Sequence, residues 1–197
     1  MKGPRHLVFV CVGNRNRSPF SEFFFSKLIS ERNKSLVDAI RVTSAGFVPQ
    51  MIKEKMAECH ISLPKPFFCR PLARTTRKAL RLQGITVPDG WRTKALSSEM
   101  VEEADMIITS LPDQKEDLVM LYPMEAAKIF TIREVSQWED YLLQEDPDYK
   151  RIPWDNNFWD FVEENAPYVA SMLSEVEKML IAAYPNILNH LGFEVAE

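Results

Sequence analysis

The chain has 197 residues, of which 46% are apolar, 26% charged and 11% aromatic, and its formal net charge is −4. This length suits one globular domain with a sizeable core, and the composition excludes collagen-like, low-complexity and wholly disordered chains. The acidic balance argues against broad binding to nucleic acid or to an acidic membrane surface. We therefore expect neither nucleic acid nor a membrane among its partners.

The sequence favours a cytoplasmic protein. The apolar run at residues 7–12 has the length of a strand, whereas a membrane-spanning helix needs about 20 apolar residues. Asn14, Arg15 and Arg17 interrupt any apolar segment of a signal peptide. The three cysteines are not closely spaced, as expected in a reducing compartment.

Predicted strands and helices alternate along the chain. The β-branched run at 6–12 predicts a strand buried on both faces, and a polar loop at 13–17 leads to a helix that ends near residue 31. Ser18-Pro19 is typical of a helix start, with Ser18 as the N-cap. Further strands are predicted at 40–44, 105–110 and 128–132, and further helices at about 53–58, 75–82, 97–104, 112–122 and 158–183.

This alternation predicts an α/β fold with a parallel four-stranded sheet and helices on both faces. We expect a single domain over residues 1–197, with an irregular, proline-rich inserted segment at about 48–72. Pro167 would kink or divide the last helix. Because ligands of parallel sheets bind beyond the carboxyl ends of the strands, the loop after the first strand is the first candidate site.

That loop has the residues of an anion-binding cradle. Cys11 and Arg17 lie six positions apart, around a loop that leads directly into a helix. Loop amides and the helix start supply partial positive charge, and the Arg17 guanidinium fits two phosphate oxygens. The same field favours the Cys11 thiolate, which is then placed for in-line attack on phosphorus. Ser18 can donate a hydrogen bond to the sulfur as it leaves the phosphoenzyme.

The spacing of Cys11 and Arg17 is weak evidence when taken alone. The alternative is a buried cysteine that only ends a strand. The context favours the cradle, because a buried strand precedes the loop, Gly13 and Asn14 lie within it, and Ser18-Pro19 opens a helix after it.

The string VCVGNRNRSP, residues 10–19, resembles the loop of the low-molecular-weight protein tyrosine phosphatase family, whose pattern is Cys-x-Gly-Asn-x-Cys-Arg-Ser-Pro. TSAG at 43–46 and LSSEMVEEADMIIT at 96–109 are similar to further segments of that family, in the same order. The resemblance extends over most of the chain except 48–72 and the tail after Pro185. It implies the three-layer sandwich of these phosphatases.

The resemblance also implies how the loop works. Cys11 would be the nucleophile, and neither metal nor cofactor would take part. Ser44 would brace Asn14 and hold the strained loop in its binding shape. Loop amides and the Arg17 side chain would bind the phosphate, the residues concerned being Val12, Gly13, Asn14, Arg15, Asn16 and Arg17.

One departure from the family lies inside the loop. The family's second loop cysteine, which can trap the nucleophile as a reversible disulfide, is Asn16 here, so we expect that protection to be absent. The loop is also similar to that of the phosphatases that act on phosphoserine in the tail of RNA polymerase II. The Ser-Ala-Gly and Ala-Asp-Met-Ile-Ile segments favour the tyrosine phosphatase branch.

A second departure concerns the general acid. The family uses the Asp of an Asp-Pro pair, on a loop before the last helix, to protonate the leaving oxygen. Asp146-Pro147 keeps the dipeptide, whereas Asp155 lacks the proline but lies directly before the closing helix. We favour Asp155, because position in the fold matters more than the neighbouring residue. The one not used would be a helix cap or a solvated loop acid.

Several other residues are less clearly assigned. Arg15 either adds charge toward an acidic substrate or points to solvent, and both interpretations stay open. His6 is expected at the surface. Four aromatic residues have two possible roles, and these are Phe47, Trp154, Phe158 and Trp159. They either form a wall around a phosphotyrosine ring or pack the closing helix on the sheet.

The leading hypothesis is a cysteine-dependent phosphatase that hydrolyses a phosphomonoester, with a phosphotyrosine protein as the favoured substrate. Phosphoserine, phosphoarginine or a small phosphate ester remain alternatives, and the oligomeric state is left open. A second hypothesis is arsenate reductase, which needs relay cysteines, and here these could only be Cys59 and Cys69. A third is a phosphate-binding module with little turnover.

Overall fold

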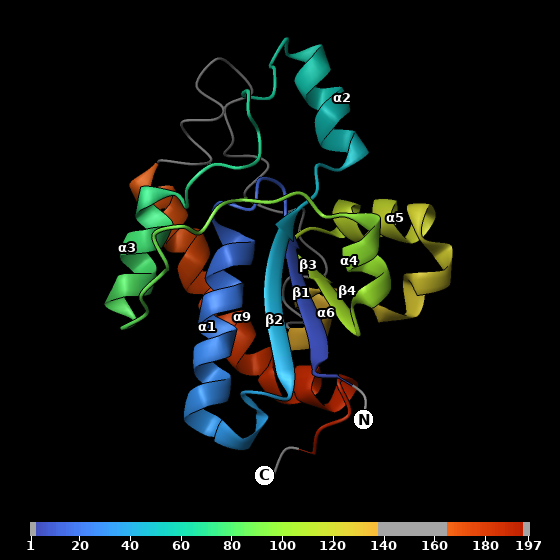
Figure 1. Cartoon of the computed structure of the whole chain (residues 1–197). Coiled ribbons are helices and arrows are strands. Elements are labelled where there is room, and N and C mark those ends of the chain that lie inside the picture. Colours follow the sequence, from blue (N-terminus) through green and yellow to red (C-terminus); the bar gives the residue numbers. More distant parts are fainter. Residues whose placement is uncertain (1–2, 138–164, 195–197) are drawn as a thin grey trace.

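The computed structural model describes residues 3–137 and 165–194. Its four strands form one parallel sheet in the order β2-β1-β3-β4, so the predicted α/β fold is confirmed (Figure 1). The elements are β1 (Arg5–Cys11), α1 (Arg17–Arg32), η1 (Lys34–Leu36), β2 (Ile40–Gly46), α2 (Gln50–Glu58), α3 (Arg74–Leu82), α4 (Ser98–Glu103), β3 (Met106–Thr109), α5 (Pro112–Leu121), η2 (Pro123–Lys128), β4 (Ile129–Thr131), α6 (Ile132–Ser136) and α9 (Ala166–His190).

Helices cover both faces of the sheet, as predicted. Leu7 and Phe9 of β1 pack into a large cluster with α1 and α9, whereas Val8 and Val10 pack into a second cluster with α4 and α5. Figure 1 shows α1, α3 and α9 on one side of the sheet and α4 and α5 on the other. Successive side chains of a strand point to opposite faces, so a run of apolar residues without alternation marks β1 as the central, doubly buried strand.

The last helix differs from its prediction at the C-terminal end. It continues to His190 because Ile187 and Leu188 are fully buried in the large cluster. Pro167 lies in the first turn of α9, where the missing N–H breaks no helical hydrogen bond, so the described helix starts beside this proline and does not run through it. Residues 158–164 of the predicted helix lie outside the described residues. Within the described ranges, no helix is both long and apolar enough to cross a membrane.

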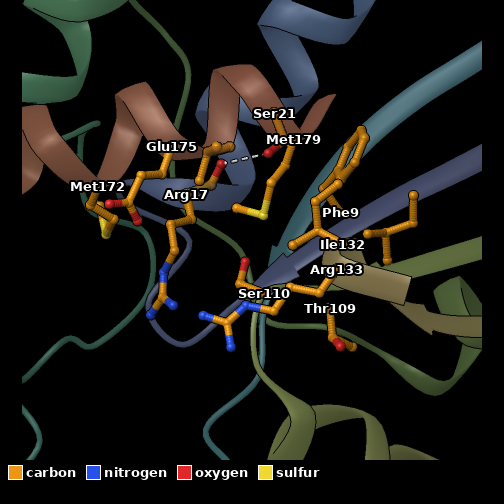
Figure 2. Close-up of a pocket in the computed structure, with 12 residues that line it drawn as sticks. Phe9, Arg17, Ser21, Thr109, Ser110, Ile132, Arg133, Met172, Glu175 and Met179 are labelled. Carbon is orange, nitrogen blue, oxygen red and sulfur yellow. Dashed lines mark hydrogen bonds between the residues drawn. The ribbon is translucent and has the colours of Figure 1, made fainter. Parts of the chain in front are cut away.

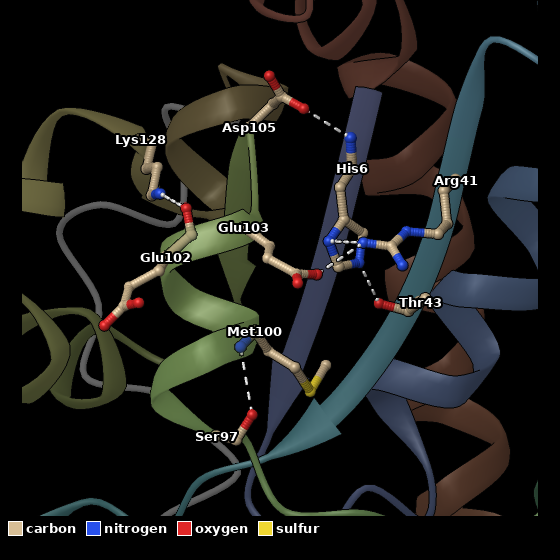
Figure 3. Close-up of polar contacts among 9 residues, drawn as sticks. All are labelled: His6, Arg41, Thr43, Ser97, Met100, Glu102, Glu103, Asp105 and Lys128. Atoms are coloured by element: carbon tan, nitrogen blue, oxygen red, sulfur yellow. Dashed lines mark hydrogen bonds and ion pairs between the residues drawn. The ribbon is translucent and has the colours of Figure 1, made fainter. Parts of the chain in front are cut away.

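The expectation that His6 lies at the surface is wrong. Its side chain is only 4% exposed, beneath Arg41 and Thr43 of β2 (Figure 3). Arg41 Nη2 donates to Nδ1 over 2.8 Å, and Nε2 therefore donates to Thr43 Oγ1, also 2.8 Å away. Burial, with the Arg41 charge as the second cause, lowers the pKa of His6 from 6.5 to about 4. His6 is therefore a neutral, hydrogen-bonded part of the sheet.

Candidate active site

The cradle loop lies at the carboxyl edge of the sheet, at the point where the order of the strands reverses. β1 has β2 on one side and β3 on the other, so the order of strands reverses beside β1. Cys11 ends β1, and α1 begins at Arg17, with only residues 12–16 between them. A crevice at the carboxyl ends of the strands, beside such a reversal, is where open α/β sheets bind ligands.

The sulfur of Cys11 is held in a defined environment. Cys11 is 4% exposed, and Ser18 Oγ lies 3.0 Å from its Sγ. The Ser18 hydroxyl also faces the Ala45 carbonyl oxygen at 3.1 Å, but it has one proton to donate. A thiolate is the stronger acceptor because its hydrogen bond is charge-assisted. The geometry therefore suits Ser18 as a donor to an ionised sulfur.

Ser18 is not the N-cap that its sequence context predicts. α1 begins one residue earlier, with Asn16 in the cap position, so Ser18 lies in the first turn of the helix. Its side chain is fully buried and faces β1 instead of the helix amides. The pair Ser18-Pro19 correctly indicated the start of a helix, but the Ser18 hydroxyl contacts the Cys11 sulfur instead of capping the helix.

Asn14 organises the centre of the loop. Its φ of 53° lies in the left-handed region, which Asn tolerates better than most residues. Its fully buried amide donates to Ser18 Oγ over 3.0 Å and to Ser44 Oγ over 2.8 Å. Its carbonyl oxygen accepts from the Lys94 amide over 3.0 Å. Because the Asn14 amide donates to Ser18 Oγ, the Ser18 proton is directed to a different atom. The two acceptors in reach are Cys11 Sγ and the Ala45 carbonyl oxygen.

The hydrogen bonds continue from Asn14 to a carboxylate of α1. Ser44 Oγ donates to Glu22 Oε2 over 2.5 Å. Burial raises the pKa of Glu22, although its hydrogen bond with Ser44 acts in the opposite direction. One chain of contacts thus joins Glu22, Ser44, Asn14, Ser18 and Cys11, and it ties β2 and α1 to the loop.

The second half of the loop is attached to α3. Asn16, which stands where the family that the loop resembles has its second cysteine, accepts a hydrogen bond from Thr76 Oγ1 over 2.6 Å. The Arg15 carbonyl accepts from the Ala73 amide over 3.4 Å. Arg15 itself is only 7% exposed, so the reading in which it points to solvent is wrong.

Two aromatic residues near the loop were not anticipated. A Cβ atom added to Gly13 would lie 3.6 Å from the ring of Phe67. Phe68 packs edge to face on Phe67, with ring centroids 4.8 Å apart. A Cβ atom added to Gly46 would meet the Phe68 ring. Both belong to the irregular segment at 48–72, which has no periodicity that would place it. Phe47, the predicted wall residue, packs instead against the cluster between the sheet and α4 and α5.

The structure brings together most of the predicted loop residues. Cys11, Ser18, Asn14 and Ser44 follow one another in a chain of hydrogen bonds. Arg17 lines a pocket beside the loop. Five of the predicted residues lie outside the described part of the chain. They are the two candidate acids, Asp146 and Asp155, and three of the candidate wall residues, Trp154, Phe158 and Trp159.

Comparison with known proteins agrees with the resemblance seen in the sequence. Residues 6–64 match the family model of low molecular weight phosphotyrosine protein phosphatase. The resemblance predicted from the sequence is confirmed. Low molecular weight protein-tyrosine phosphatase A of Mycobacterium tuberculosis and of Mycobacterium bovis are each 50% identical over 46 residues. That match spans 23% of this chain and 27% of each curated relative.

The similarity of the fold extends over nearly the whole chain. The YwlE arginine phosphatase of Geobacillus stearothermophilus superposes with a TM-score of 0.63 over 98% of this chain and 100% of its own, at 18% identity. The low molecular weight protein tyrosine phosphatase of T. tengcongensis gives 0.56 over 90% and 97%, at 27% identity. The arrangement of the sheet and its helices is therefore the fold of these two proteins.

Proposed function

We propose that this protein is a cysteine-dependent phosphatase that hydrolyses a phosphomonoester, with a phosphotyrosine protein as its substrate. The observation that carries the proposal is the hydrogen bond from Ser18 to the buried Cys11 sulfur, 3.0 Å long, within a loop that leads into the N-terminus of α1. A cysteine that only ended a strand would need neither a donor on its sulfur nor a loop braced from three other segments.

The proposed reaction has two steps. The Cys11 thiolate attacks phosphorus, an S–P bond forms as the P–O bond to the leaving group breaks, and Asp155 gives its proton to the leaving oxygen. Arg17 and the amides of residues 12–17 stabilise the equatorial oxygens. Water then attacks the phosphocysteine and gives its proton to Asp155, and Ser18 stabilises the departing thiolate. The chemistry assigned to this chain uses neither metal nor cofactor.

The preference for an aryl phosphate is supported by the ring of Phe67 beside Gly13. Gly13 belongs to the cradle, so a group attached to a bound phosphate would leave the loop next to an aromatic side chain. Aromatic rings contribute about 0.5–1.5 kcal/mol when they pair in offset or edge-to-face geometry. A phosphotyrosine ring could gain this contact, whereas the short stem of phosphoserine offers no aromatic surface.

The test is hydrolysis of an aryl phosphate by the wild type and by Cys11→Ser. We expect turnover in the wild type and none in the variant, with a phosphocysteine trapped by rapid acid quench. Equal rates in both proteins would refute the proposal. Tight binding of a phosphotyrosine peptide without phosphate release would instead indicate a phosphate-binding module.

The choice of general acid needs its own pair of variants. Asp155→Asn should strongly lower kcat for substrates with poor leaving groups, because these need a proton from a general acid. Asp146→Asn should leave kcat for the same substrates unchanged. The opposite result would assign the role to Asp146. Substrates with a good leaving group serve as the control, because their release depends little on protonation.

A further inference from the structure

One stretch of this acidic protein carries positive charge only. The whole chain has 28 acidic residues against 24 Lys and Arg residues, yet residues 59–88 contain no Asp or Glu. The charged side chains of this stretch are Lys65, Arg70, Arg74, Arg77, Lys78 and Arg81. Four of them belong to α3, so the positive charge is concentrated on one helix.

Three cations share the exposed side of α3. Arg74, Lys78 and Arg81 follow one another at spacings of four and three residues, which places them along one side of the helix. All three are exposed, and none of their side chains forms an ion pair with another described residue. Arg77, in contrast, is half-buried and donates to the Val87 carbonyl oxygen over 3.2 Å. We call Arg74, Lys78 and Arg81 the α3 cationic face.

This arrangement of charge opposes the helix that carries it. Like charges three and four positions apart repel each other on a helix. Arg74 is the first residue of α3, where the helix dipole disfavours a cation, and the first turn has no acidic residue to offset it. The neighbouring carboxylate of Glu177, on α9, accepts a hydrogen bond from Gln83 over 3.0 Å. An anion bound along the α3 cationic face would relieve both kinds of repulsion.

The opposite side of α3 is attached to the cradle. Thr76 is fully buried and donates to Asn16 over 2.6 Å, and the Ala73 amide donates to the Arg15 carbonyl oxygen over 3.4 Å. A helix rises about 1.5 Å per residue, so the α3 cationic face begins within about one helical turn of this attachment. A peptide bound in the cradle can therefore reach it with a neighbouring part of its chain.

The α3 cationic face is separate from the arginine that the proposed function assigns to the phosphate. Arg17 lines the small pocket of Figure 2 together with residues of β1, β3, α6 and α9. No residue of α3 lines this pocket. An anionic group on α3 would thus bind beside the phosphate without competing for Arg17.

We propose that the α3 cationic face binds an acidic segment of the protein substrate, a few residues away from the phosphorylated residue. The inference rests on the proposed function, because it assumes that a phosphoprotein occupies the cradle. From Arg74 to Arg81 the helix rises about 10 Å, which is the span of about three residues of extended chain. A short segment with two or three carboxylates therefore matches the three cations in length and in charge.

An acidic peptide fits this surface better than a nucleic acid does. The face has three cations on one short helix, whereas the chain as a whole has a net charge of −4. A long polyanion would extend beyond α3 and meet this negative charge, which opposes its binding. A short acidic segment ends before it leaves the helix.

The test uses four phosphotyrosine peptides with identical residues directly beside the phosphotyrosine. Two peptides carry three Glu residues at a distance of four to six positions, one before and one after the phosphotyrosine, and two matched peptides carry Gln there. We expect one of the acidic peptides to have a kcat/KM about tenfold above that of its Gln counterpart, at about twofold for each exposed ion pair. The gain should lie in KM, because the contact is distant from the reacting atoms. High salt should reduce it.

Substitutions on α3 locate the contact. Lys78→Gln should lower the ratio of kcat/KM between acidic and Gln peptides about twofold, and the triple variant Arg74→Gln, Lys78→Gln, Arg81→Gln should bring it to about one. Lys34→Gln is the matched control, because Lys34 is also an exposed lysine but lies before β2, at the amino end of the sheet. Its ratio should equal that of the wild type. The ratio does not depend on the fraction of folded enzyme, so a partly unstable variant still gives an answer.

Three results would overturn the inference while the proposed function stands. The first is a wild-type ratio of one with both acidic peptides. The second is a ratio that the triple variant leaves unchanged. The third is an equal fall of the ratio in Lys34→Gln and Lys78→Gln, which would mean that net charge alone is responsible.

Binding measurements decide the inference if the wild type hydrolyses none of the peptides. In that case the proposed function fails, and calorimetry compares acidic and Gln peptides on the wild type and the triple variant. Tighter binding of an acidic peptide that the triple variant loses would support the α3 cationic face, and equal binding would refute it. A single-stranded oligonucleotide of equal charge that binds the wild type more tightly, and not the triple variant, would assign the surface to nucleic acid and overturn the inference.

Discussion

Asn14 offers the sharpest test of how the cradle is held, because its three hydrogen bonds and its backbone angle can be changed separately. Asn14→Gly removes the contacts to Ser18, Ser44 and Lys94 but fits the φ of 53°. Each such bond contributes about 1 kcal/mol net, so this variant should lose about 3 kcal/mol of unfolding free energy. Asn14→Ala should lose about 1 kcal/mol more, because a Cβ atom disfavours the left-handed region.

Asn14→Asp separates stability from chemistry. The carboxylate keeps the shape of the side chain and the acceptor for the Lys94 amide, but it cannot donate to Ser18 or Ser44. The single Ser18 proton then turns toward Asp, and the Cys11 sulfur loses its donor. The new negative charge also opposes both the thiolate and the phosphate, by about 3 kcal/mol at an effective dielectric constant of about 20. This should lower kcat/KM by about a hundredfold.

Urea unfolding measures the first effect, and hydrolysis of an aryl phosphate measures the second. The expected order of stability is wild type, then Asn14→Gly, then Asn14→Ala, with Asn14→Asp the variant whose activity falls further than its stability. Wild-type activity in Asn14→Asp would refute the role given to the hydrogen bonds. Equal stability of the Gly and Ala variants would refute the role given to the backbone angle.

Three further variants test other parts of the molecule. Ser18→Ala should lower kcat about tenfold and produce a burst of the released alcohol, because the departing sulfur loses a hydrogen bond of about 1.5 kcal/mol; a rate without a burst would contradict this. Gly46→Ala should destabilise the fold and inactivate the loop, because its Cβ would lie 2.9 Å from the Val12 carbonyl oxygen; Gly90→Ala, with nothing within 4 Å, is the control. The pKa of His6, lowered to about 4, means that the unfolded chain takes up a proton below pH 6.5 while the folded chain does not. Stability should therefore fall as pH drops, by about 2 kcal/mol from pH 7 to 5, and urea unfolding of His6→Gln should lack this slope; an identical slope would refute the assignment.

The parts of the fold that could be predicted are those encoded by neighbouring residues. The continuous apolar run at 6–12 identified a strand buried on both faces because a central parallel strand has no solvent side. The cradle was equally local, since its strand, loop and helix start follow one another within residues 5–19.

Contacts between distant segments could not be predicted in the same way. The hydrogen bond from Thr76 to Asn16 joins residues 60 positions apart, and no local pattern announces it. Phe67 and Phe68 lie in a segment without periodicity, so their position beside Gly13 and Gly46 depends on how that segment folds back. His6 was misplaced for a related reason, since its burial depends on β2 lying alongside.

These long-range contacts explain why the cradle depends on the whole domain. In the proposed reaction, the end of β1 supplies the nucleophile and the loop before α1 supplies the phosphate-binding amides. The shape of this loop is fixed from outside by Ser44 of β2, by Thr76 of α3 and by the Lys94 amide. Three segments remote in sequence must therefore be in place before the loop can adopt its binding shape. A donor network that preexists in this way needs no reorganisation when charge develops on the phosphoryl oxygens, which is the physical basis of electrostatic catalysis. The activity of a variant in any of these braces should then follow the geometry of the loop more closely than the overall stability of the domain.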